Sequence, residues 1–407
     1  MGEYFISYSG AGAGTPNAHG LVLGQRHLLL DGGAGVDPSS MERPDWLWIS
    51  HAHGDHCGGL MALIERWPTV TVLATEQTRR LLPVVLSEGQ GVGAQVESIC
   101  RRIEVLQPGR RRPLEESEGW GVTALRAGHC PGAAMLMVDK RVGGRCQGRV
   151  VYTGDFCTHD QSLVGGGGAP VARDDHGVDL LIMESILATD EAADGLYWEE
   201  EAAALVEAVD ASSGPVLIGA MGVGEAQEVA SLLKKEGRRR FLVDAYYEAI
   251  FERLGLAEGL VFGERRRMRD RLRGGGVVIS SGPRFQRGST SAYLSRELLG
   301  NERATILVLN RARGGTGAGR LLATGRGEEI QWPGYRGPLS ATVKRCRLIN
   351  HAPRWQLLGM MEAVAPKQTL LVHGPTGGRW AIKRAWESRG GAGEVKVVEE
   401  GVSCRLY

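Results

Sequence analysis

Four side chains of metal-ligand type lie within one short segment near the start of this 407-residue chain. The segment, His51-Ala52-His53-Gly54-Asp55-His56, directly follows the apolar run Trp46-Leu47-Trp48-Ile49, which has the pattern of a short buried strand. Imidazole nitrogens and carboxylate oxygens suit Zn²⁺, and a tight loop can direct alternating side chains at two ions. The spacing therefore predicts a two-metal site, in which His51 and His53 bind one ion and the Asp-His pair that ends the segment binds the other.

A site of this kind needs more ligands than one loop supplies. Three further candidates lie beside expected strands: His129 comes before one, Asp155 follows Val150-Val151-Tyr152, and His373 follows Thr369-Leu370-Leu371-Val372. Each of them alone is more often a turn or core residue. Together they complete two four-ligand shells, with Asp155 placed as a carboxylate that bridges the two ions.

The rest of the pattern predicts an α/β protein with an insertion. The chain is longer than one hydrophobic core usually allows, and short strands with polar or glycine turns fill its first half. From about Asp194 the pattern changes to regular alternation of strands and helices, which favours an inserted unit with a parallel sheet. We expect a first domain segment at residues 1–193, the insertion at 194–327 and a return segment at 328–407.

Charge within this insertion is unevenly distributed. Residues 194–228 contain eight acidic residues and no Lys or Arg, whereas residues 234–327 contain 20 Lys and Arg against nine Asp and Glu. The arginines at 238–240 and 265–273 are candidates for phosphate contacts, but a solvated charged face would explain them equally well.

Overall composition excludes several classes of protein. Hydrophobic residues make up 43% and charged residues 23% of the chain, as in ordinary soluble proteins. We find no apolar stretch near the ~20 residues that a membrane helix needs, and no basic leader at the start. Seven scattered cysteines without a CxxC pair do not make a disulfide framework. We therefore expect a cytoplasmic protein with no membrane partner.

The motifs together resemble the metallo-β-lactamase superfamily, and within it the β-CASP nuclease branch of 3′-end-processing endonucleases and RNase J-like ribonucleases. The resemblance covers nearly the whole chain. The segments that resemble the family's motifs are Gly10-Ala11-Gly12 with Leu30-Asp31-Gly32-Gly33, Ile49 to Leu60, Ala127 to Ala134, Tyr152 to Phe156, Met183-Glu184-Ser185, Asn350-His351-Ala352 and Leu371-Val372-His373-Gly374. Within the insertion, Ala220 to Glu228, Ser281 to Gly288 and Thr316 to Arg320 are similar to segments of the β-CASP cap. The resemblance implies an αββα sandwich with an inserted α/β cap domain.

The resemblance also implies a role for each candidate residue. The two zinc ions would be bound by His51, His53, Asp55, His56, His129, Asp155 and His373. Asp31 would orient a ligand imidazole from behind, and Asp55 would also act in catalysis. His351 would be the general acid, with Glu184 orienting it. The substrate-binding candidates are Ser281, Arg287, Ser289, Thr316 and Arg320.

The implied activity is cleavage of RNA by a two-metal hydroxide mechanism that leaves 5′-phosphate and 3′-hydroxyl ends. His373 favours RNA, and single-stranded RNA is the expected partner. A nuclease of single-stranded DNA, a hydrolase of small esters or thioesters on the same core, and a scaffold without catalysis remain alternatives. The sequence leaves open endonuclease against exonuclease action and whether the chain forms a homodimer.

Three positions depart from the family pattern. Ser185-Ile186-Leu187 stands where Ser-Thr-Tyr is usual, Glu225 replaces an arginine, and Pro353-Arg354 follows the His351 motif in place of an acid. None of these changes removes an expected metal ligand. They bear instead on substrate preference and rate.

Overall fold

The chain consists of two compact units. One contains the residues up to Asp160, Val164–Gly195 and the residues from Asn350 onward, and the other contains Gln161–Leu163 and Leu196–Ile349. The computed structural model describes residues 3–9, 16–87, 93–115, 119–169, 176–237, 240–310, 312, 314–399 and 403–405. Gly10 to Gly12 of the first motif therefore lie outside the described residues.

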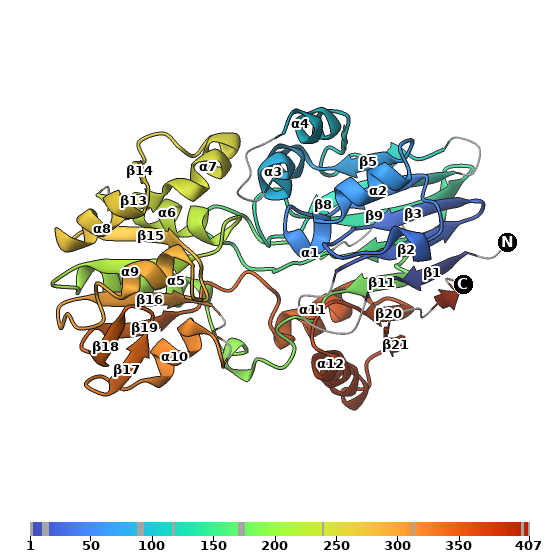
Figure 1. The fold of residues 1–407 in the computed structure, drawn as a ribbon. Helices are drawn as coiled ribbons and strands as arrows, with labels where there is room; N and C mark the ends of the chain where they lie inside the picture. The colour runs from blue at the N-terminus through green and yellow to red at the C-terminus, as the bar shows by residue number, and fades with distance from the viewer. Residues whose placement is uncertain are drawn as a thin grey trace. The chain divides into compact units, whose positions relative to one another are not determined.

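The first unit is built on two mixed β-sheets (Figure 1). One sheet has the strand order β22-β1-β2-β3-β4-β5-β6 and the other the order β21-β20-β11-β10-β9-β8-β7. Their bounds are β1 (Tyr4–Ser7), β2 (His19–Leu23), β3 (Arg26–Leu30), β4 (Trp46–Ile49), β5 (Thr71–Ala74), β6 (Glu104–Val105), β7 (Arg112–Pro113), β8 (Trp120–Arg126), β9 (Ala134–Val142), β10 (Arg145–Tyr152), β11 (Leu180–Met183), β20 (Gln368–Leu371), β21 (Glu394–Val397) and β22 (Ser403–Arg405).

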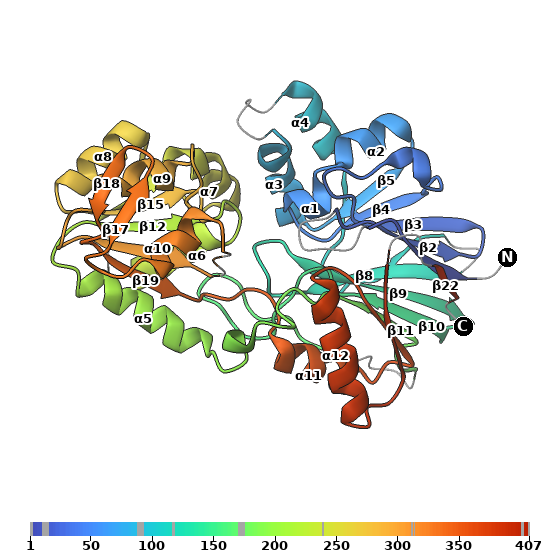
Figure 2. The same cartoon turned by 60° about the horizontal axis from the view of Figure 1, so that its bottom comes forward.

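Both faces of the central strands are buried, which explains their uninterrupted apolar sequences. Side chains alternate between the two faces of a strand, so Leu28 and Leu30 enter the core that both sheets share, while Leu29 is buried on the opposite face. The outer faces are covered by α2 (Leu60–Arg66), α3 (Glu76–Leu86) and α4 (Ala94–Arg101) beside the first sheet, and by α11 (Arg354–Val364) and α12 (Thr376–Ser388) beside the second (Figures 1 and 2). This is the αββα arrangement that the sequence predicts.

The second unit is an α/β domain with a parallel sheet, also as predicted. Its strand order is β14-β13-β15-β12-β16-β19, and each neighbouring pair is parallel. The strands are β12 (Val216–Ala220), β13 (Phe241–Asp244), β14 (Phe262–Gly263), β15 (Val277–Ser281), β16 (Thr305–Leu309) and β19 (Thr342–Cys346), with a separate hairpin of β17 (Glu329–Trp332) and β18 (Tyr335–Pro338). The helices are α5 (Trp198–Asp210), α6 (Glu225–Lys235), α7 (Glu248–Leu254), α8 (Arg265–Arg273), α9 (Thr290–Ser295) and α10 (Gly317–Ala323).

The bounds of this second unit differ from those expected. It extends to Ile349 rather than to residue 327, because β19 pairs in parallel with β16 and adds a strand to the sheet. Gln161–Leu163 also belongs to it, since the carboxylate of Glu228 accepts hydrogen bonds from the backbone N–H groups of Ser162 and Leu163. Burial raises the pKa of Glu228 to about 7.

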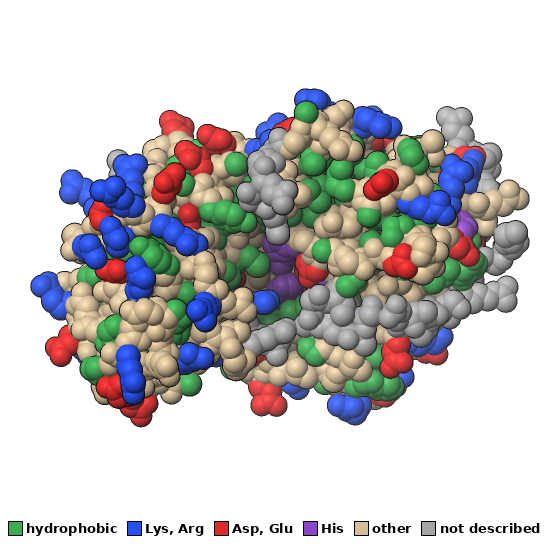
Figure 3. All heavy atoms as spheres, viewed as in Figure 1, with side chains coloured by type: hydrophobic (Ala, Val, Ile, Leu, Met, Phe, Trp, Pro, Cys, Tyr) green, Lys and Arg blue, Asp and Glu red, His purple; other side chains and the backbone are tan. Residues whose placement is uncertain are grey.

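Surface charge on the second unit follows the bias seen in the sequence. Lys and Arg side chains are spread widely over its surface (Figure 3). The helix α8 has arginine at 265, 266, 267, 269, 271 and 273 and buries only Met268 and Leu272, whereas α5 has three consecutive glutamates in its first turn. Arg238 and Arg239 of the other basic cluster lie outside the described residues.

Polar side chains follow several strands of the first unit at the point where each strand ends. Asp31 follows β3, His51 follows β4, Asp155 follows β10, Glu184 follows β11 and His373 follows β20. The carboxyl ends of parallel strands meet at one edge of a sheet, which is where α/β proteins place their sites. Within the described residues, no helix is long and apolar enough to cross a membrane.

Replacing Leu30 by Ala should destabilise the first unit by about 2–5 kcal/mol, because the side chain is fully buried between the sheets and its loss leaves a cavity. Urea unfolding in the presence of a chelator measures this change. Val142→Ala is the matched control, since Val142 is 58% exposed and its truncation should change stability by less than ~0.5 kcal/mol. Equal losses of stability in the two variants would contradict the burial of Leu30 in the core that the two sheets share.

Candidate metal centre

The His51 to His56 segment forms a tight turn between β4 and a single helical turn, α1 (Gly54–Cys57). His53 precedes α1 with an extended backbone, so the chain reverses direction within the motif. The glycines that follow Asp31 allow the close approach of two loops. A Cβ atom on Gly33 would lie 2.0 Å from the backbone oxygen of Asp55, so no larger residue fits there.

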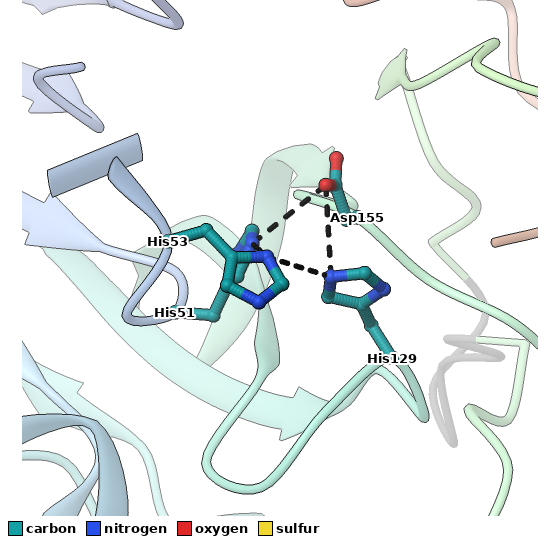
Figure 4. Close-up of side chains that lie close together, drawn as sticks. All are labelled: His51, His53, His129 and Asp155. Atoms are coloured by element: carbon teal, nitrogen blue, oxygen red, sulfur yellow. Dashed lines mark hydrogen bonds and ion pairs between the residues drawn. The ribbon is translucent and has the colours of Figure 1, made fainter. Parts of the chain in front are cut away.

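The first predicted ligand set converges on one point. The Nε2 atoms of His51 and His129 lie 3.0 and 3.1 Å from Nδ1 of His53, and 3.6 and 3.8 Å from Oδ2 of Asp155 (Figure 4). These residues come from β4, from the loop between β8 and β9, and from the end of β10. One donor atom from each of the four lies within 4.8 Å of the others, which is close enough for them to share one metal ion.

The second predicted set converges beside the first. His56, Asp55 and His373 form a second group of donor atoms within 4.8 Å of one another. Asp155 also borders this group, because its Oδ2 lies 3.3 Å from Nε2 of His56 and its Oδ1 lies 3.5 Å from Nε2 of His373. All seven predicted metal ligands are therefore brought together, and Asp155 lies between the two sets as expected.

The charge balance of this group favours a divalent cation. Oδ1 of Asp155 is buried and has no hydrogen-bond partner in the part of the chain that the structure describes. Burial lowers the pKa of His51 and His129 well below the ordinary value, and neighbouring imidazoles lower it further, so these rings are neutral and their lone pairs are available. Burial would also lower the pKa of His56, but Asp155 and Asp31 raise it well above the ordinary value. The buried carboxylates thus favour a positive charge at this point, and the donor set suits zinc.

Asp31 contacts the ring nitrogen of His56 that lies away from the ligand groups, and it can therefore orient this imidazole as the sequence predicts. Its Oδ2 lies 2.7 Å from Nδ1 of His56 and accepts a hydrogen bond of 2.7 Å from the Tyr152 hydroxyl. The backbone N–H and hydroxyl of Ser50 also donate to this carboxylate. With Nδ1 engaged by Asp31, Nε2 of His56 faces Asp155 and the second ligand group.

His351 and Glu184 form the expected pair. Nδ1 of His351 lies 3.1 Å from Oε1 of Glu184 and 3.8 Å from Oδ2 of Asp155. Glu184 is buried, and it also accepts hydrogen bonds from the backbone N–H groups of Phe156 and Ile186. Burial would lower the pKa of His351, but the carboxylates of Glu184 and Asp155 raise it to about 9. The imidazole can therefore carry a proton at neutral pH next to the ligand groups.

The backbone at His373 is held in an unusual conformation. His373 has a φ of 34°, a left-handed value that is costly for a side chain with a Cβ atom, and Gly374 follows with a φ of 125°. The carbonyl of His373 accepts hydrogen bonds from the backbone N–H and the hydroxyl of Ser185. A Cβ atom on Gly374 would lie 2.7 Å from the backbone of Ser185. The segment after β20 is thus fixed where it presents His373.

The expected substrate-binding residues all belong to the second unit, where two surface cavities contain most of them. Arg287 and Arg320 line a cavity of about 550 Å³, together with Trp332. Ser281 and Ser289 line another of about 380 Å³. Three of the hydroxyls are already used locally: Ser281 donates to Asp244, and Ser289 and Thr316 accept hydrogen bonds at the starts of α9 and α10.

The two charged residues that depart from the family pattern, Glu225 and Arg354, form hydrogen bonds with nearby groups. Glu225 accepts hydrogen bonds from the backbone N–H of Met221 and from the side-chain amide of Asn310, which joins the ends of β12 and β16. Arg354 donates to the carbonyl of Ala188 at 3.2 Å and lies 3.4 Å from a carboxylate oxygen of Asp194. Both side chains therefore stabilise the structure within their own unit.

Two residues that contact the predicted site residues have no individual role in the sequence-based prediction. Tyr152 was recognised only as part of a motif, although its hydroxyl donates to Asp31. Asn17 was not singled out, and its side-chain amide lies within 3.1 Å of ring nitrogens of both His56 and His373. A motif search misses Asn17 because it lies 39 and 356 residues away from these partners.

Comparisons with known proteins agree with this architecture. Residues 13–179 match the model of the metallo-beta-lactamase superfamily. An uncharacterised protein of Synechocystis is 32% identical over 223 residues, which are 53% of this chain and 37% of that protein. A ribonuclease of Thermus thermophilus is 25% identical over 446 aligned positions, covering 98% of this chain and 99% of the relative.

The match in structure is equally extensive. The crystal structure of an Enterococcus faecalis protein of unknown function superposes with a TM-score of 0.66 at 14% identity and covers 100% of both chains, which supports the fold. The chain spans less than half of the length of several curated relatives. Taken with the αββα sandwich and its inserted α/β unit, these matches show a metallo-β-lactamase domain in residues 13–179, and they indicate the β-CASP branch.

Proposed function

We propose that this protein is a metal-dependent ribonuclease that binds two zinc ions and cleaves RNA phosphodiester bonds, leaving 5′-phosphate and 3′-hydroxyl ends. The observation that carries the proposal is the pair of ligand sets that share Asp155 and lie next to His351. The ribonuclease names of the Thermus thermophilus relative and of two archaeal relatives agree with this substrate class.

In this proposal the residues divide into three roles. His51, His53 and His129 would hold one ion, Asp55, His56 and His373 would hold the other, and Asp155 lies close enough to both sets to be a shared ligand. Two zinc ions in such a site supply Lewis acidity and lower the pKa of a bound water toward neutrality. Asp31 keeps the His56 imidazole in the orientation in which Nε2 faces the ions.

His351 acts as the general acid. Its Nδ1 lies 3.8 Å from Oδ2 of Asp155, so the ring lies beside the ligand groups and would be near the leaving 3′ oxygen of a phosphodiester bound there. Glu184 holds the Nδ1 side of the ring, so Nε2 is the atom that donates its proton to this oxygen. Arg287 and Arg320 are proposed to contact phosphates of the strand, since both are exposed beside one cavity.

Removing the metal should abolish RNA cleavage, because in this proposal the two ions supply the Lewis acidity and the activated water. Protein dialysed against a chelator and then resupplied with Zn²⁺ is incubated with 5′-labelled RNA, single-stranded DNA and a thioester. Asp155→Ala should behave like the chelated protein and bind less zinc. His27→Ala is the matched control, since His27 pairs with Glu42 on the surface and should keep full activity. A metal-loaded wild type that leaves RNA intact but hydrolyses the thioester would contradict the ribonuclease function.

His351→Ala should slow RNA cleavage by about 10²–10⁴-fold, the usual contribution of a general acid, while the zinc content stays unchanged. Glu184→Gln should have a smaller effect, because it keeps a hydrogen-bond acceptor beside Nδ1 but loses the negative charge. Single-turnover rates and metal analysis of the three proteins measure both quantities. Cleavage by His351→Ala at the wild-type rate would exclude the acid role, and loss of zinc from this variant would assign His351 to metal binding instead.

A further inference from the structure

Asn17 is a buried polar residue next to the metal centre with a firmly held backbone. It is about 1% exposed and lies just before β2. Its backbone N–H donates to the carbonyl of Asp55 at 2.8 Å, and its carbonyl accepts from the N–H of Gly33 at 3.0 Å. The residue is thus joined to the ligand loop on one side and to the loop after β3 on the other.

The side-chain amide of Asn17 points at the second ligand set. Nδ2 lies 2.7 Å from Nδ1 of His373 and 3.1 Å from Nε2 of His56. A half-turn of the amide about its terminal bond would put Oδ1 at the same point, because the two ends of an Asn amide have nearly the same shape. The amide can therefore either donate to His373 or accept from it.

The tautomer of His373 decides whether the Asn17 amide donates a hydrogen bond to this imidazole or accepts one from it. Nε2 of His373 faces the ligand group, 3.5 Å from Oδ1 of Asp155 and 3.8 Å from Oδ2 of Asp55. An imidazole nitrogen can bind a metal only through a free lone pair, so the ring proton must then be on Nδ1. That N–H group needs an acceptor, and Asn17 provides the only hydrogen bond found for His373 Nδ1 among the described residues.

The other imidazole near Asn17 does not need this acceptor. Nδ1 of His56 already has Oδ2 of Asp31 at 2.7 Å, so the His56 tautomer is fixed independently. The two imidazoles of the second set are thus supported from behind by two different residues: Asp31 supports His56, and Asn17 supports His373.

We propose that Asn17 is a positioning residue that accepts the Nδ1–H of His373 and so fixes the tautomer in which His373 binds the second metal ion. The inference rests on the proposed function, in that it assumes a two-ion centre. The loss of such an outer partner typically lowers metal affinity about 10- to 100-fold. The effect should fall on the ion held by Asp55, His56 and His373 and spare the ion held by His51, His53 and His129.

The experiment compares Asn17→Leu, which has a similar volume but no acceptor, with Asn17→Asp, which keeps an acceptor oxygen. Ser9→Ala is the matched control, because the Ser9 hydroxyl supports the neighbouring segment through Ala18 and is nearly as buried. Zinc content is measured by atomic spectrometry across a series of buffered free-zinc concentrations. Thermal unfolding is measured with and without a chelator, since a bound ion stabilises the folded state according to its affinity.

The dissociation constant of the more weakly bound zinc ion should be about 10- to 100-fold larger in Asn17→Leu than in wild type. Its unfolding temperature should be close to that of wild type in chelator and lower than that of wild type with zinc. Asn17→Asp and Ser9→Ala should keep both ions. The inference is overturned if Asn17→Leu binds zinc like wild type, if it loses both ions equally, or if Asn17→Asp loses the second ion as well.

The same measurements distinguish a failure of this inference from a failure of the proposed function. If wild type binds no zinc or only one ion, the two-metal centre itself is wrong. If wild type binds two ions but leaves RNA intact, the metal centre and the role of Asn17 stand while the ribonuclease proposal fails.

Discussion

The buried carboxylate of Asp155 is the group on which the organisation of the first unit depends. Its oxygens lie within 3.8 Å of ring nitrogens of five imidazoles among the described residues, those of His51, His56, His129, His351 and His373. A buried carboxylate costs roughly several kcal/mol unless positive charge or hydrogen bonds offset its desolvation. Burial keeps the pKa of His51 and His129 low, so these two rings are neutral and supply no charge, whereas Asp155 raises the pKa of His56 and His351. A divalent cation bound by these donors would offset the charge of the carboxylate as well.

The arrangement around the ligands matters as much as the ligands themselves. An imidazole can present either nitrogen, and the partner of the distant nitrogen decides which one faces the metal. Asp31 has this position behind His56, Glu184 has it behind His351, and the carbonyl of Asn350 lies 2.9 Å from Nδ1 of His129. Asn17 completes the series at His373. The buried polar groups around the centre therefore specify one orientation for each of these four rings.

Several elements were predictable because their pattern is local. The bounds of β4 match the expected ones and those of β20 lie one residue from them, since an apolar run next to polar residues is visible in a short window. The helix α8 was seen only as a basic cluster, because just two apolar side chains, Met268 and Leu272, interrupt its arginines. The end of the second unit was misplaced for a similar reason: β19 is a partly exposed edge strand with Lys344 and Arg345, and only its pairing with β16 reveals it.

By itself the sequence determined the ligand types, the metallo-β-lactamase domain and the α/β insertion, because metal ligands keep a short spacing and strands keep their apolar repeat. It named all seven residues that converge at the centre, together with Asp31, Glu184 and His351. Only the tertiary structure decided which nitrogen of each imidazole faces Asp155, that Glu225 and Arg354 bond within their own units, and that Asn17 contacts His373. Those contacts join residues far apart in the chain, and their geometry is set by how β-strands stack and end, which no local spacing records.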